Sequence, residues 1–249
     1  MRQIIVSLIL ISSLIISGCL DSENLDDLSC PNVDAPIGTA PTEISFSGEN
    51  DTVTDFFKLE QYLLLFDTKH EGDGHFSIVI YGTEDEYLDL IVNEIGMFEF
   101  EVYASLDLEL DPFWSEYGLS GQDFFLEISA DGPWQIVISQ PRFSEGSGEP
   151  ISISGTGTTA STSYYFDCGL RTVDVNHYGD GHFSIVIYDV SGDYIELLAN
   201  EVDEYSGTSI LDIDKKGLYV FDISANLDAN WDFTIGNIPS SSSSEEEET

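Results

Sequence analysis

Hydrophobic and polar residues alternate along much of the chain, and one alternating stretch occurs twice. Residues 72–81 read GDGHFSIVIY, and residues 179–188 repeat all ten letters. In the first copy one face of an extended segment carries Phe76, Ile78 and Ile80, and the other carries Ser77, Val79 and Tyr81. A period of two after a Gly-Asp-Gly turn is typical of a β-strand. An identical repeat at a fixed offset indicates a duplicated unit.

The repeat extends beyond these ten letters. Both copies end with an Ile-Ser-Ala segment and a segment that begins with a tryptophan, Trp134 or Trp231. Many short strands with turn residues between them favour a sandwich. We therefore expect an all-β chain of two tandem antiparallel β-sandwich domains produced by internal duplication; the jelly-roll-like plan of these domains is implied by the resemblance described below. We place them at residues 43–141 and 150–239, with both tryptophans in the cores.

The first copy contains about a dozen more residues than the second, and we assign them to residues 106–117, LDLELDPFWSEY. Phe113, Trp114 and Tyr117 in this segment are a candidate ligand patch. Exposed aromatic side chains on a loop of a rigid sandwich suit stacking on sugars or contact with a protein. The alternative is that the three rings fold back as a local hydrophobic plug.

A set of positions in the two copies resembles a known module. In the first copy they are Gly48, Phe57, Leu59, His70, Gly72, Phe76, Asn93, Glu94, Ala130 and Trp134. The second copy adds residues 197–201, 205–207, 217–219 and Ala225. Together they are similar to sandwich modules of bacterial and archaeal surface proteins, and in plan to the pre-peptidase C-terminal domain. The resemblance implies a jelly-roll-like accessory domain without agreed catalytic residues, so it implies a fold and no chemistry.

The two ends of the chain differ in composition from the repeats. Residues 1–18 resemble a lipoprotein signal peptide, in which an apolar run ends in a lipobox before Cys19. Lipid on Cys19 would hold the chain at the outer, extracellular face of a prokaryotic cell membrane. An ordinary secretory signal with a free cysteine is the alternative. Residues 19–42, acidic and containing proline, predict an extended tether, and residues 240–249, which are rich in serine and glutamate, predict a disordered tail.

With Cys19 assigned to lipid, Cys30 and Cys168 form an even pair in an oxidising compartment. A disulfide between them would join the tether to the second copy, and two free thiols are the alternative. Asn50 begins the sequon Asn-Asp-Thr and is a candidate glycosylation site.

The charge of the chain is strongly one-sided. Asp and Glu number 47 against 7 Lys and Arg, for a net charge of −40. Nucleic acid is excluded as a partner because its binding requires a basic surface. So acidic a surface repels itself unless salt screens it, or unless its carboxylates hold divalent cations. We favour the halophilic interpretation because the acidic residues are spread along the chain.

All four histidines flank the two Gly-Asp-Gly turns. The candidate metal ligands are His70, Asp73 and His75 in the first copy and His177, Asp180 and His182 in the second. Two imidazoles and a carboxylate form a credible transition-metal set, provided that the imidazoles face each other across a hairpin. The alternative is that the histidines pack and cap turns whose glycines supply the backbone freedom.

Motifs for nucleophilic or zinc-dependent hydrolysis are absent from the sequence. We therefore expect a lipid-anchored, non-enzymatic surface protein that binds a glycan or another protein and needs no cofactor. The first alternative is an extracellular ion- or metal-binding lipoprotein, which would hold a divalent cation at the His-x-Gly-Asp-Gly-His segments. A weaker alternative is a glycan hydrolase built from paired carboxylates.

Overall fold

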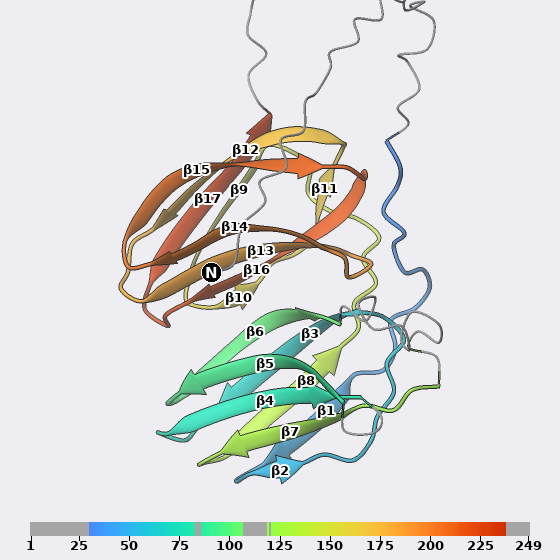
Figure 1. The fold of residues 1–249 in the computed structure, drawn as a ribbon, viewed down its shortest axis with the longest axis vertical. Helices are drawn as coiled ribbons and strands as arrows, with labels where there is room; N and C mark the ends of the chain where they lie inside the picture. Colours follow the sequence, from blue (N-terminus) through green and yellow to red (C-terminus); the bar gives the residue numbers. More distant parts are fainter. Residues whose placement is uncertain (1–29, 83–85, 107–118, 120, 238–249) are drawn as a thin grey trace, which may run out of the picture.

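The computed structural model describes residues 30–82, 86–106, 119 and 121–237. Every regular element within these residues is a β-strand, and the strands form four antiparallel sheets. No helix that could span a bilayer occurs among the described residues. The predicted all-β class is thus confirmed, and Figure 1 shows the four sheets as two sandwiches stacked along the long axis of the molecule.

The first sandwich, the lower one in Figure 1, consists of two four-stranded sheets. One has the order β1-β8-β3-β6, formed by Ile44–Gly48, Trp134–Ser139, Leu63–His70 and Phe98–Ser105. The other has the order β2-β7-β4-β5, formed by Thr52–Val53, Phe125–Ala130, His75–Tyr81 and Tyr87–Ile95. Most strands that are consecutive in the chain lie in opposite sheets, which is the jelly-roll arrangement.

The second sandwich repeats this order strand for strand. Its first sheet is β9-β17-β12-β15, formed by Ile151–Thr156, Asn230–Asn237, Gly169–His177 and Tyr205–Ile213. Its second sheet is β10-β16-β13-β14, formed by Thr159–Ala160, Gly217–Ala225, His182–Asp189 and Tyr194–Val202, with β11 (Tyr164–Phe166) also paired to β16. The predicted pair of jelly-roll-like sandwiches is confirmed, and their origin by duplication stays a prediction.

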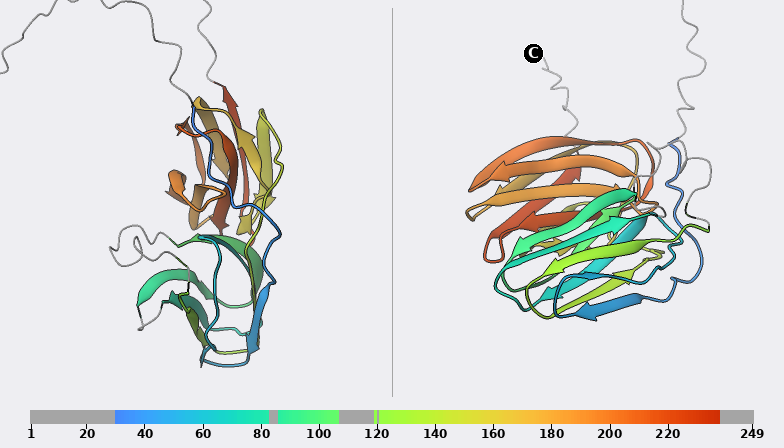
Figure 2. Two further views of the ribbon diagram at one scale, coloured as in Figure 1. Left: turned by 90° about the vertical axis from the view of Figure 1, so that its right-hand side faces the viewer. Right: turned by 60° about the horizontal axis from the view of Figure 1, so that its bottom comes forward.

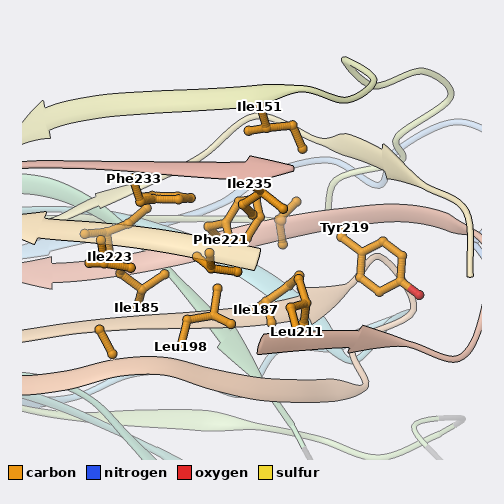
Figure 3. Close-up of a cluster of buried hydrophobic side chains, with 14 of the residues drawn as sticks. Ile151, Ile185, Ile187, Leu198, Leu211, Tyr219, Phe221, Ile223, Phe233 and Ile235 are labelled. Carbon is orange, nitrogen blue, oxygen red and sulfur yellow. The ribbon is translucent and has the colours of Figure 1, made fainter. Parts of the chain in front are cut away.

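Each sandwich closes over its own hydrophobic cluster. In the first, Phe76, Ile78 and Ile80 point inward from β4 and are fully buried, as the alternation predicts. Figure 3 shows the cluster of the second sandwich, in which Ile185 and Ile187 occupy the corresponding places on β13. Burial of side chains of this size contributes about 1.5–3 kcal/mol each, so each sandwich has the apolar contacts of an independent core.

The two tryptophans hold equivalent core positions, as predicted. Trp134 and Trp231 are each 2% exposed. Their rings lie over Gly48 and Gly155, where an added Cβ would come within 2.5 Å of a ring atom. Glycine is therefore needed at both positions, because any side chain would push the first strand of the sandwich away from the tryptophan.

The sandwiches meet where edge strand β6 lies against β10 and β16 on the outer face of the second sandwich. The Tyr103 N–H donates a hydrogen bond to the Asp222 carboxylate at 2.7 Å, and the Tyr103 hydroxyl donates to the Ser161 carbonyl at 2.7 Å. Leu63 and Tyr103 accordingly pack with the hydrophobic cluster of the second sandwich. This contact covers backbone groups that an open sheet edge would leave unpaired.

Part of the predicted tether is held against the second sandwich. Cys30 and Cys168 form a disulfide with their Cα atoms 5.9 Å apart. The Val33 N–H donates to the Lys216 carbonyl at 2.9 Å, and Val33 itself is buried. The left view of Figure 2 shows the blue N-terminal segment running past the second sandwich before it enters the first.

Candidate functional site

The predicted histidine pairs do not come together. The turn between His70 and His75 connects β3 in one sheet to β4 in the other, so it is not a hairpin within one sheet. His70 points into the core, with Nδ1 2.8 Å from the Gly96 carbonyl oxygen and its ring centroid 4.8 Å from that of Phe76. His75 is exposed on the outer face, with Nε2 2.8 Å from Asn93 Oδ1. The expectation that the imidazoles face each other is therefore corrected: the sheet crossing turns one inward and the other outward.

The second copy has the same arrangement. His177 is buried and stacks on the ring of Phe183 at 4.5 Å, whereas His182 is exposed. The turn aspartates Asp73 and Asp180 are exposed. In the part of the chain that the structure describes, no three His, Cys, Asp or Glu side chains are grouped so that they could hold a metal ion. These positions fit the alternative interpretation, in which the histidines pack against the turns.

A carboxylate from the connection between β7 and β8 closes the first turn. Asp131 Oδ1 lies 3.2 Å from His70 Nε2. An added Cβ at Gly72 would lie 2.3 Å from Asp131, and one at Gly74 would lie 2.4 Å from it. In the second copy Asn226 takes this place and donates to the turn backbone at 2.8 Å. The turn glycines thus make room for a neighbouring side chain, which is a structural role.

Several predicted sites lie outside the described residues, namely Cys19, Phe113, Trp114 and Tyr117. The sequon residue Asn50 is described and exposed, as a modification site requires. Its carbonyl accepts a hydrogen bond from the Trp134 indole at 3.1 Å, so the backbone of the sequon is tied to the core.

An aromatic row crosses the outer face of the sheet β2-β7-β4-β5, the front sheet of the lower sandwich in Figure 1. Tyr87 on β5 lies directly opposite Tyr81 on β4, and Tyr81 lies directly opposite Phe125 on β7. Phe56, which follows β2, continues the line with its ring 5.6 Å from that of Phe125. We call Tyr87, Tyr81, Phe125 and Phe56 the aromatic row.

The rings at the two ends of the aromatic row are the most open to solvent. Tyr81 and Phe125 stack on each other at 5.1 Å, whereas Tyr87 and Phe56 meet them edge-on. Tyr87 is 58% exposed and Phe56 is 67% exposed. Because neighbouring strands are about 4.8 Å apart, the row across four adjacent segments is about 14 Å long. Such a row presents a continuous apolar surface with a polar hydroxyl at each tyrosine.

The sequence contained only part of the signal for this row. Alternation alone puts Tyr81 on the outward face of its strand, where an aromatic residue is unexpected. Tyr87, Phe125 and Phe56 come from other segments, and only the strand register brings them into line with Tyr81. Register depends on pairing between distant segments, so the row could not be read from any one segment.

A partly buried carboxylate marks the contact between the sandwiches. Burial beneath β6 raises the pKa of Asp222 to about 7, although the hydrogen bond from the Tyr103 N–H favours the charged form. Burial, and to a lesser degree the nearby Asp222 carboxylate, also raises the pKa of the Tyr188 hydroxyl. The contact is therefore sensitive to the protonation of Asp222.

A cleft of about 570 Å³ lies between the two sandwiches, lined by Tyr62 and Leu106 of the first and by Tyr194 of the second. Its acidic side chains are Asp193, Glu196, Asp212 and Asp214. Asp193 forms an ion pair with Lys215 at 2.8 Å. Carboxylates on so acidic a chain are expected on any surface, so the cleft is a weaker candidate site than the aromatic row.

No protein-family model matches the chain, and no curated protein matches it in sequence. Some solved structures are distantly similar. The M60 catalytic domain with the CBM51-1 and CBM51-2 domains from Clostridium perfringens ZmpB is 8% identical with a TM-score of 0.23, over 85% of this chain and 38% of that one. A β-glucuronidase from Ruminococcus gnavus is 13% identical with a TM-score of 0.21, over 76% and 36%.

The VP2 subviral particle of infectious bursal disease virus is 10% identical with a TM-score of 0.21, over 82% of this chain and 73% of that one. The chain thus spans little more than a third of the two bacterial proteins. Similarities this low carry no argument about function, so the function has to be inferred from the residues themselves.

Proposed function

We propose that the chain is a non-catalytic binding protein on the outer face of a prokaryotic cell, attached by lipid on Cys19, and that the aromatic row contacts its ligand. The observation that carries the proposal is the row itself, four neighbouring rings on one sheet face with Tyr87 and Phe56 more than half exposed at its ends.

Exposed rings grouped on one face favour binding over a purely structural role. Contiguous apolar patches on a soluble protein often mark interaction sites, and tyrosine is enriched among the residues that dominate binding energies. The rings stand on or beside paired strands, which hold them in place before a ligand arrives. Little ordering is then needed on binding, so more of the contact energy contributes to affinity.

Two further features support an extracellular, salt-rich setting. A disulfide such as Cys30–Cys168 persists in oxidising compartments and is rare in the cytosol. The net charge of −40 produces self-repulsion that concentrated salt screens.

The binding role is tested with envelope fragments of the source cells and the purified protein lacking residues 1–18. We expect the double variant Tyr87→Ala/Phe56→Ala to bind at least tenfold more weakly than the wild type, because it removes the two most exposed contact rings. Tyr194→Ala is the matched control, since Tyr194 is the counterpart of Tyr87 in the second sandwich and is 55% exposed. Equal binding by the wild type and the double variant would contradict the proposal.

The anchor is tested separately by Cys19→Ser, which removes the acceptor of the lipid. We expect the variant to leave the membrane fraction and the wild type to stay in it. Retention of both proteins in the membrane fraction would remove lipidation from the proposal and leave the binding role untouched.

A further inference from the structure

A second row of side chains on the same sheet face is polar. Ser77 on β4 lies directly opposite Asn93 on β5 and Ser129 on β7. The Ser129 hydroxyl donates a hydrogen bond to Asp51 Oδ1 at 3.2 Å. We call Asn93, Ser77, Ser129 and Asp51 the polar row. It runs parallel to the aromatic row at about 13 Å, because four residues of β4 separate Ser77 from Tyr81.

The polar row is suited to hydroxyl groups. Serine hydroxyls and the asparagine amide both donate and accept hydrogen bonds. An amide oxygen only accepts, so His75 Nε2 donates to Asn93 Oδ1 across their 2.8 Å contact. This contact orients the Asn93 amide so that its NH₂ group points away from His75. A ligand rich in hydroxyls, which also donate and accept, matches such a row.

The negative charge of this face limits which ligands it can bind. Between the two rows lie Leu90, Val79 and Glu127, directly opposite one another in the register. Asp51 and Glu127 are acidic side chains on this face, and they add to the field of a chain with a net charge of −40. An anionic ligand or a second copy of the chain would be repelled. A neutral ligand would not be.

We infer that the ligand is a neutral glycan chain that lies along β4 from the aromatic row to the polar row. The C–H faces of its sugar rings stack on the aromatic row, and its hydroxyls bond to Ser77 and Asn93. A ligand that touches both rows spans about 13 Å, which is more than one sugar ring, so the site takes an oligosaccharide or polysaccharide. The inference rests on the proposed function, since it names the ligand of the same surface.

Comparison with the second sandwich disfavours a protein as the ligand of this face. Its equivalent sheet β10-β16-β13-β14 does dock a polypeptide, edge strand β6. At that face Val220 stands where the first sandwich has Phe125, because Val220 pairs with Tyr188 as Phe125 pairs with Tyr81. Among the described residues, the full row of four rings therefore occurs only on the sheet β2-β7-β4-β5, whose outer face does not carry the docked strand β6.

The inference is tested by affinity electrophoresis and calorimetry with neutral glucans, mannans and galactans, and with sulfated forms of each. We expect binding to at least one neutral polysaccharide and much weaker binding to its sulfated form. Tyr87→Ala should weaken this binding about tenfold, through loss of a stacking ring. Asn93→Ala should weaken it about fivefold, through loss of a hydrogen bond.

Matched controls come from the second sandwich, where Tyr194→Ala and Asn200→Ala change the corresponding positions and should leave the affinity unchanged. Affinity losses of the same size in these control variants would overturn the assignment of the glycan to the first sandwich.

A periodate treatment of the envelope fragments, which cleaves sugar diols, separates failure of this inference from failure of the proposed function. Loss of Tyr87-dependent binding after periodate supports the glycan. Tyr87-dependent binding that survives periodate, with no neutral polysaccharide bound, overturns the glycan inference and indicates a protein partner for the same surface. Binding to untreated fragments that does not depend on Tyr87 overturns both.

Discussion

The outer faces of two equivalent sheets have different neighbours. The sheet β10-β16-β13-β14 of the second sandwich is covered in part by strand β6, whose Tyr103 N–H reaches Asp222. The sheet β2-β7-β4-β5 of the first sandwich has the same strand order, and Phe56 and Tyr87 stand exposed on it. The backbone plan is shared, so the difference lies in the outward side chains.

These side chains change at a few positions only. The tyrosine pair Tyr188 and Tyr194 of the second sandwich repeats Tyr81 and Tyr87, with ring centroids 6.2 Å apart against 6.1 Å. At the next position along the row, the second sandwich has Val220 where the first has Phe125. Under the proposed function, the same jelly roll serves once as a docking surface and once as a ligand surface, and the outward side chains make the difference while the fold stays the same.

The two sandwiches close over separate hydrophobic clusters, and substitutions in these clusters should have the largest effect on stability. Phe76 and Phe183 are equivalent and fully buried. Replacing either with alanine should cost about 3–5 kcal/mol of unfolding free energy, through lost apolar contact and the cavity left behind. Hydrogen exchange read by mass spectrometry should show Phe76→Ala loosening β3–β8 first and Phe183→Ala loosening β12–β17 first. Uniform loosening of both sandwiches by either variant would show a single cooperative core.

The disulfide between Cys30 of the tether and Cys168 should have the next largest effect. Cys30 and Cys168 are 138 residues apart, and the loop they close contains the whole first sandwich. Replacing both with alanine should lower the unfolding free energy by about 2–4 kcal/mol, because the unfolded chain gains freedom. Thermal melts of the variant and of the reduced wild type should agree. A melting temperature equal to that of the oxidised wild type would show that the other contacts of the tether, such as Val33 with Lys216, hold it in place without the disulfide.

The third effect depends on pH and comes from Asp222, on the face of the sheet β10-β16-β13-β14 that strand β6 covers. Its pKa is about 7 in the folded protein against an ordinary value of 3.8, because burial disfavours the charged form. The folded state therefore holds the proton more tightly than the unfolded state, and stability falls as pH rises from about 4 to about 7.

Asp222→Asn should remove this loss, which is on the order of 3 kcal/mol between pH 4.5 and 8 for a pKa of about 7. The measurement is the melting temperature of the wild type minus that of the variant from pH 4.5 to 8, which cancels the repulsion common to both. Glu127→Gln is the control, because Glu127 is the exposed counterpart of Asp222 on the open face. Parallel pH profiles for the wild type and Asp222→Asn would show that the Asp222 carboxylate stays hydrated at the contact.

Parts of the fold were predictable from short stretches of sequence. The inward faces of β4 and β13 follow from alternation over a few residues, and both tryptophans were expected in the cores where the structure has them. The histidine pairs were not predictable in this way. A turn has the same sequence pattern whether the two strands it joins belong to one sheet or to opposite sheets. Here β3 and β4 belong to opposite sheets.

The sequence by itself determined the strand class, the number of sandwiches and the inward residues, because a period of two and turn-forming residues act over neighbouring positions. Only the tertiary structure decided which outward residues meet. Tyr87, Tyr81, Phe125 and Phe56 become one surface through the pairing of strands from distant parts of the chain. Only the docking of β6 decided which of two equivalent faces is covered, because that contact joins residues more than a hundred positions apart, such as Tyr103 and Asp222.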